Sequence, residues 1–184
     1  MPCPAGSEVV VGVGDCRIAF LPAGSLSTYA LGSCIAVVTY DWKTRVGGLL
    51  HFMLPDSTID PNRAAVNPFV YADTGLPALF RMMEEAGSTR KRVRCCITGG
   101  ASMMADSTHF ETGKRNYLAL RKVLWRNGIF IDREDVGGNE SRSVRLDLAT
   151  GRIDLRTGSE KSRIFAPAAI GLMGRSANDA GARC

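Results

Sequence analysis

The stretch LGSCIAVVTYDWKTRVGGLLHFMLPD, residues 31–56, sets the architecture expected of this chain. It contains two apolar runs, 34–40 and 46–54, separated by the polar segment DWKTR. Apolar, β-branched runs around a short polar turn predict a β-hairpin. The hairpin would carry Cys34 at its start and His51, one of only two histidines in the chain, in its second strand.

Further strands and two helices are expected around this hairpin. Strands are predicted within 8–20, at 93–97, at 129–136, and in a second hairpin formed by 143–148 and 152–155. One helix is predicted to begin after Thr74, its N-cap, and a second to cover 113–127, and each ends before a glycine. Residues 55–69 are expected to form a long loop. Because most strands pair in hairpins instead of alternating with helices, the predicted fold class is α+β.

The length and composition indicate one domain, 1–158, followed by a tail. Residues 159–184 lose periodicity and gain glycine, alanine and serine, so this tail is predicted to be disordered. No run of eighteen apolar residues is present, so no membrane insertion is expected. The N-terminus lacks the pattern of a secretory signal, and the expected location is the cytoplasm.

Charge and cysteine content exclude two further classes of function. The net charge is +5, and the dense basic run TRKRVR at 89–94 is interpreted as the solvated approach to a strand, so no nucleic-acid partner is expected. The six cysteines form no C-x-x-C pair, and no metal site is expected. Without a secretory signal, a disulfide framework is not expected either.

The turn of the first hairpin decides whether Cys34 and His51 meet. A four-residue loop, 41–44, would place them directly opposite each other, with Cβ atoms about 4.5–5.5 Å apart on one face of the sheet. A five-residue loop would place them on opposite faces. Both alternatives are compatible with the residues of the turn.

A cysteine beside a histidine has a chemical use. Imidazole can activate a thiol, whose ordinary pKa is about 8.5, as a nucleophile. The backbone amides of Gly32 and Ser33, just before Cys34, would be available to stabilise an oxyanion. A third polar group usually orients such a histidine. The alternative interpretation is that both residues only fill the core.

Five blocks, in order, give the chain a resemblance to a known family. They are STYALGSCIAVVTYD, VGGLLHFMLPDS, ITGGASM, TGKRN and DVGGNESRSVRLDLATGRI, and the likeness runs from about Val9 to Leu155. Together they resemble the chemoreceptor glutamine deamidase family, CheD. The resemblance implies hydrolysis of specific receptor glutamines to glutamate through a thioester, without a cofactor. It also implies packed mixed β-sheets flanked by helices, as in cysteine deamidase toxins of the CNF type.

The resemblance implies roles for residues that match the family motifs. Cys34 would be the nucleophile, His51 the general base and acid, and Thr28 the polar residue that orients the histidine. The glycines Gly99 and Gly100 would form a backbone wall beside the site, or simply a tight turn. Two departures are a glycine commonly found in place of Ala30 and a phenylalanine commonly found in place of Thr98.

The implied partners are the cytoplasmic domains of chemoreceptors, as substrate, and a CheC-type phosphatase. Two other functions remain open. One is a regulatory binding module that acts mainly through the phosphatase. The other is a cysteine hydrolase with another protein target.

Overall fold

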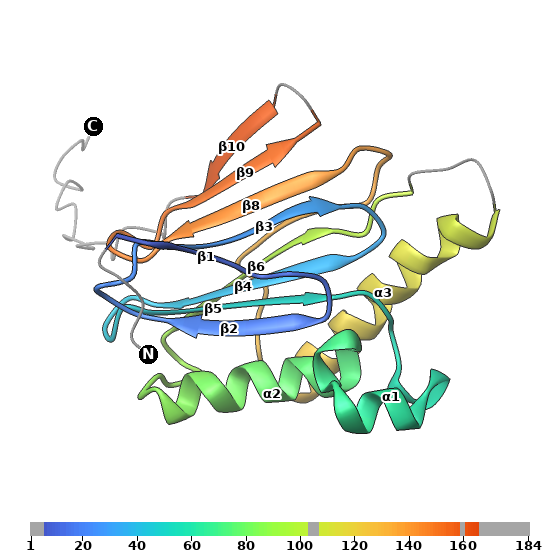
Figure 1. Cartoon of the computed structure of the whole chain (residues 1–184), viewed down its shortest axis with the longest axis horizontal. Helices are drawn as coiled ribbons and strands as arrows, with labels where there is room; N and C mark the ends of the chain where they lie inside the picture. Colours follow the sequence, from blue (N-terminus) through green and yellow to red (C-terminus); the bar gives the residue numbers. More distant parts are fainter. Residues whose placement is uncertain (1–5, 103–106, 159–160, 166–184) are drawn as a thin grey trace, which may run out of the picture.

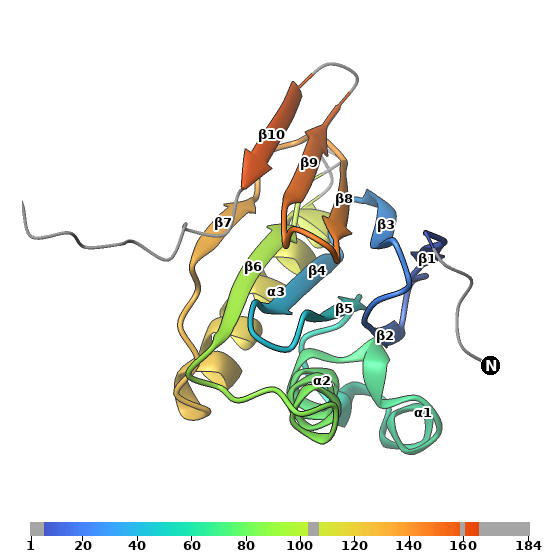
Figure 2. The same ribbon diagram turned by 90° about the vertical axis from the view of Figure 1, so that its left-hand side faces the viewer.

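The computed structural model describes residues 6–102, 107–158 and 161–165, and they form three stacked layers (Figure 1; Figure 2). Sheet A contains, in spatial order, β1 (Glu8–Val10), β3 (Ser25–Leu31), β8 (Arg142–Asp147), β9 (Ile153–Thr157) and β10 (Lys161–Phe165). Sheet B contains β2 (Asp15–Ala19), β5 (Val46–Phe52), β4 (Ile35–Asp41), β6 (Val93–Gly99) and β7 (Arg133–Val136). The helical layer holds α1 (Pro61–Val66), α2 (Ala72–Glu85) and α3 (Ser107–Arg126), with short 3-10 turns η1 (Ser57–Ile59) and η2 (Pro68–Val70).

The β4–β5 hairpin lies at the centre of the molecule because it is covered on both faces. Every residue of both strands is buried. One face, which includes Ala36, Val38 and Leu49, packs against sheet A, and the other, which includes Val37 and Leu50, packs against α2 and α3. Strands buried on both faces have nearly continuous apolar sequences, as this stretch does.

Both sheets are mixed. Their pairings are antiparallel except for β1 with β3 and β6 with β7, which are parallel. Figure 2 shows the two sheets above one another and the helices beneath sheet B. This arrangement confirms the α+β class and the packed mixed sheets flanked by helices that were expected.

Several local predictions need correction. The hairpin turn contains residues 42–45, because Asp41 pairs with Val46, so it begins one residue later than expected. The predicted loop contains helix α1, whose N-cap Asp60 accepts a hydrogen bond from the amide of Arg63. Thr74 is not an N-cap. It lies inside α2, and its hydroxyl donates to the carbonyl of Pro68. Hydrogen bonds from side chains to the nearby backbone, such as these, cannot be predicted from the spacing of apolar residues.

The end of the domain also differs from the prediction. Residues 161–165, assigned by sequence to a disordered tail, form strand β10, which pairs antiparallel with β9. The rest of the predicted tail, 166–184, lies outside the described residues. Among the helices that the structure describes, none has both the length and the apolar character needed to cross a membrane.

Candidate functional site

Thr28 and His51 come from different sheets and meet in the layer between them. The Thr28 Oγ1 atom lies 2.9 Å from His51 Nδ1, and the same hydroxyl donates to the carbonyl of Val11 at 2.7 Å. Both side chains are 1% exposed. The two are 23 positions apart in sequence, so only the packing of β3 on β5 brings them together.

This contact sets the tautomer of the histidine. A threonine hydroxyl has one proton, and Thr28 gives it to Val11, so toward His51 the hydroxyl oxygen acts as the acceptor. His51 Nδ1 therefore carries the ring proton, and Nε2 keeps a free lone pair. Within the described residues Nε2 is buried and has no hydrogen-bond partner. The ring is thus prepared to accept a proton at Nε2.

Burial keeps this imidazole neutral. Loss of solvation lowers the pKa of His51 to about 4, because a charged ring would be separated from water. At neutral pH the side chain is therefore a free base and not an imidazolium ion.

The register places Cys34 diagonally across from His51 and not directly opposite. The residue that pairs with His51 is Ala36, so the structure has neither the 41–44 loop nor the direct pairing of Cys34 with His51 that this loop would give. The later turn shifts the register by two positions, and a shift by two keeps both side chains on the same face. Cys34 precedes Ala36 by two residues and is partly buried against the core between the sheets. Diagonal neighbours lie about 7–8 Å apart, within reach of a small rearrangement.

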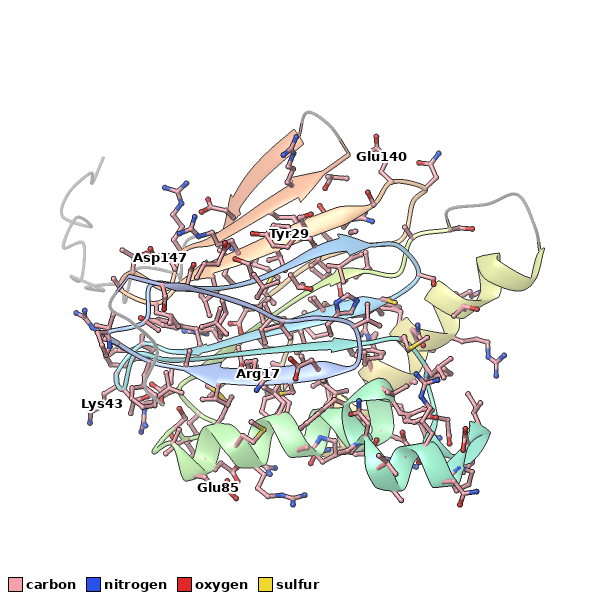
Figure 3. All side chains as sticks on the ribbon, in the orientation of Figure 1. Arg17, Tyr29, Lys43, Glu85, Glu140 and Asp147 are labelled. Carbon is pink, nitrogen blue, oxygen red and sulfur yellow. The ribbon has the colours of Figure 1, made fainter. Side chains whose placement is uncertain are left out.

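A bulge in β3 shapes the approach to Cys34. Thr28 pairs with Val144 but Leu31 pairs with Arg142, so β3 contains one extra residue between these pairs. Ala30 within the bulge has φ of 56°, a left-handed conformation that favours glycine. The neighbouring Tyr29, labelled in Figure 3, is half exposed and donates to Glu8.

The Cys34 thiol is not pre-ionised. Burial raises its pKa, and a hydrogen bond from its own backbone amide opposes this effect in part. Within the described part of the chain, the amide of Ser33 donates to no backbone carbonyl. That amide is therefore available to bind a negatively charged oxygen near the sulfur.

The glycine pair at the end of β6 lies directly against the Cys34 peptide. Gly99 has φ of 113°, and a Cβ there would lie 2.2 Å from the Cys34 carbonyl oxygen. The amide of Gly100 donates to the same carbonyl at 2.8 Å. The two glycines thus lie against the backbone of the turn that carries Cys34. Because the Gly100 amide is occupied, it is not available as an oxyanion donor. The carbonyl of Gly32 similarly accepts from Ala101.

Two features near the site were missed by the sequence analysis. Asn116 of α3 is completely buried and donates to the carbonyls of Ser33 and Met53. A buried ion pair joins Arg142 of β8 to Asp135 of β7, with N–O distance 2.8 Å. Asn116 lies in the block TGKRN, which contributed to the family resemblance without a role. The ion pair joins the two sheets, and no local pattern indicates it.

One groove of the described surface lies away from the candidate residues. A groove of about 970 Å³ lies between the second half of α3 and the start of β7, and none of the candidate residues lines it. No group of three or more His, Cys, Asp or Glu side chains that could hold a metal ion occurs among the described residues.

Comparison with known proteins was made by sequence and by structure. The family model for CheD chemotactic sensory transduction matches residues 53–157, a span that begins after Thr28, Cys34 and His51. A relative from Solibacter usitatus (strain Ellin6076), described as "Probable chemoreceptor glutamine deamidase CheD", is 49% identical over 157 residues, 85% of this chain and 93% of its own. A similarly described protein from Syntrophus aciditrophicus (strain SB) is 43% identical over 150 residues, 82% of this chain and 94% of its own.

Among solved structures, the Bacillus licheniformis hypothetical protein YfiH matches with a TM-score of 0.35 and 16% identity. The match covers 72% of this chain and 60% of that one.

Proposed function

The chain belongs to the CheD family, and from this premise we propose that it is a protein-glutamine glutaminase that converts receptor glutamines to glutamate and ammonia. Its substrate would be the cytoplasmic domains of chemoreceptors, and it would act in the cytoplasm. The observation that carries the proposal is the Thr28–His51 hydrogen bond, which leaves Nε2 of a neutral imidazole free on the face of the sheet that Cys34 shares.

The first half of the proposed reaction forms a thioester. His51 Nε2 removes the proton from Cys34 Sγ as the sulfur attacks the side-chain carbonyl carbon Cδ of the glutamine. The carbonyl oxygen becomes an oxyanion, and the amide of Ser33 would stabilise it. When the tetrahedral intermediate collapses, protonated His51 gives its proton to the leaving nitrogen and ammonia departs.

The second half regenerates the enzyme. Water attacks the thioester while His51 Nε2 takes one of its protons. The bond between carbon and sulfur then breaks, and the proton returns to Cys34 Sγ. The product is a glutamate side chain, and the balance requires no cofactor. Thr28 holds the ring in one tautomer through both halves, because its oxygen continues to accept from Nδ1.

The protonation states favour a general-base mechanism over a preformed ion pair. Burial raises the pKa of the Cys34 thiol and lowers that of His51 to about 4. A neutral thiol beside a neutral imidazole is therefore the resting state. Proton transfer would accompany attack on the substrate, and the two side chains would approach each other when the glutamine binds.

The decisive experiment uses receptor cytoplasmic fragments as substrate. Ammonia release and the small mass gain of each converted glutamine are measured for the wild type, for Cys34→Ala, and for Cys95→Ala as a matched control. Cys95 is buried on the opposite face of sheet B, toward the helices. We expect conversion by the wild type and by Cys95→Ala, and none by Cys34→Ala. Unchanged conversion by Cys34→Ala would contradict the mechanism.

The same assay separates the other functions. If none of the three forms deamidates the receptor and all three bind a CheC-type phosphatase, the chain acts as a regulatory binding module. Appearance of shorter receptor fragments would instead indicate a cysteine protease. As part of the proposal, a CheC-type phosphatase is a second partner, whose binding can be measured separately with the inactive Cys34→Ala protein.

A further inference from the structure

The ladder between β4 and β5 ends just where the two candidate side chains need to be held together. Its last pair is Ile35 with Phe52. Beyond that pair the backbones diverge, and Met53 bonds to Val70 in place of β4. The turn that carries Cys34 and the strand that carries His51 thus have no further backbone rung between them in the described structure.

The side chain of Asn116 joins the two backbones at this open end. Its Nδ2 atom donates to the carbonyl of Ser33 at 3.0 Å and to the carbonyl of Met53 at 2.9 Å. Ser33 is adjacent to Cys34, and Met53 is two residues after His51. Two carbonyl acceptors also fix the orientation of the carboxamide, because its oxygen would be repelled in the same position. Asn116 therefore takes the place of the missing rung.

The other side of the Cys34 turn is held by backbone bonds alone. Gly100 and Ala101, which follow β6, donate to the carbonyls of Cys34 and Gly32. These bonds fix the turn relative to β6. Relative to β5, the turn is held by the Ile35–Phe52 pair at its end and, beyond that pair, by Asn116.

Helix α3 is shaped to bring Asn116 to this point. Gly113, one turn earlier on the same face, packs so closely that a Cβ there would lie 2.5 Å from the carbonyl oxygen of Gly100. Leu120, four residues later, continues the buried face. The small residue permits the close approach, and the carboxamide then reaches both carbonyls. This contact gives a physical reason for the glycine and asparagine of the TGKRN block.

We propose that Asn116 is a positioning residue that sets the distance between Cys34 and His51 by bridging the backbone carbonyls next to each. Its effect on turnover rests on the proposed deamidase function, but its effect on the two side chains does not. In the described structure the Asn116 carboxamide donates to the backbone carbonyls of Ser33 and Met53, so it would act on Cys34 and His51 through the backbone.

The test compares Asn116→Leu with Asn127→Leu. Asn127 follows the end of the same helix, is partly buried, and also donates its Nδ2 to a backbone carbonyl, that of Val123. Both variants lose side-chain hydrogen bonds to backbone carbonyls, but only Asn116→Leu loses the contacts that join the backbones next to Cys34 and His51. With receptor fragments we expect kcat to fall about 10- to 100-fold for Asn116→Leu with KM within about twofold, since small misplacements have effects of this size. Asn127→Leu should keep the wild-type kcat.

A second measurement needs no receptor. The rate of iodoacetamide alkylation at Cys34, followed by peptide mass mapping, is compared with and without His51→Gln in the wild-type and Asn116→Leu backgrounds. We expect His51→Gln to slow alkylation in the wild type and to have little effect once Asn116 is replaced, because the two side chains are then uncoupled. If Asn116→Leu does not fold, Asn116→Ala is used in the same cycle.

The outcomes separate the two proposals. Equal coupling between Cys34 and His51 in both backgrounds, or a change in KM alone, would overturn the role of Asn116. Loss of coupling without any receptor deamidation by the wild type would support that role and contradict the proposed function.

Discussion

Acidification should destabilise the folded protein through His51, by an amount that the structure allows to be worked out. Its pKa is about 4 when folded and near 6.5 when exposed. Above pH 6.5 neither state binds the proton, so the stability is complete. Between pH 6.5 and pH 4 only the unfolded state binds it, so the free energy of unfolding falls as the pH falls. The difference of about 2.5 pKa units corresponds to about 3 kcal/mol, reached near pH 4, with about 2 kcal/mol at pH 5.

The measurement compares the wild type with His51→Gln in urea unfolding at several pH values between 7 and 4. Carboxylates titrate in both proteins, so their effects cancel in the difference between the two curves. We expect the wild type to lose stability relative to the variant by the amounts above as the pH falls. NMR titration provides an independent check, because the chain has only two histidines and the variant assigns their signals. A ring that titrates near 6.5, or a pH-independent difference in stability, would refute the account of a neutral buried base.

Three substitutions test other parts of the site. Thr28→Val keeps the shape of the side chain but leaves the carbonyl of Val11 and the N–H of His51 without the Thr28 hydroxyl. We expect the free energy of unfolding in urea to fall by about 2–5 kcal/mol, and kcat to fall as well. A decrease below about 0.5 kcal/mol would contradict the hydrogen bonds through Thr28. Gly99→Ala should abolish deamidation, because its Cβ would collide with the backbone of the Cys34 turn. The control Gly128→Ala is also at positive φ but has no atom within 4 Å of the added Cβ, so it should cost only about 1 kcal/mol of stability in urea unfolding. Equal deamidase activity of the two variants would count against the wall. Arg142→Met should destabilise the protein by about 3–5 kcal/mol, because it removes the cation paired with the largely buried carboxylate of Asp135. Adding Asp135→Leu to the same chain should recover part of the loss. An unchanged denaturation midpoint would show that the pair contributes little.

The bulge of β3 offers a gain in stability. Ala30 has a left-handed backbone conformation, which costs an alanine about 1–2 kcal/mol and a glycine much less. The greater freedom of glycine in the unfolded chain offsets part of this difference, so Ala30→Gly should stabilise by about 0.5–1 kcal/mol in urea unfolding. A destabilised variant would mean that the contacts of the Ala30 methyl group contribute more free energy than the relief of backbone strain.

Much of the architecture follows from local sequence. The apolar runs of residues 34–40 and 46–54 predict a hairpin, and the structure confirms it as β4 and β5. Both strands are buried because each face of sheet B is covered by a different layer. The helix predicted at 113–127 exists as α3, although it begins at Ser107. The short helix α1 was missed, since it has no buried residue and so no apolar period. Patterns of burial thus predict elements that pack and overlook those that do not.

The sequence alone determined which chemical groups are available: a cysteine and a histidine on neighbouring strands, with a family resemblance that indicates their use. It could not determine how they are arranged. A turn displaced by one residue moves the partner of His51 from Cys34 to Ala36, and only the packing of the strands selects between such registers. The contacts of Thr28 with His51 and of Asn116 with Ser33 join residues 23 and 83 positions apart. Side-chain hydrogen bonds over such separations depend on how layers stack, and no local periodicity records that stacking.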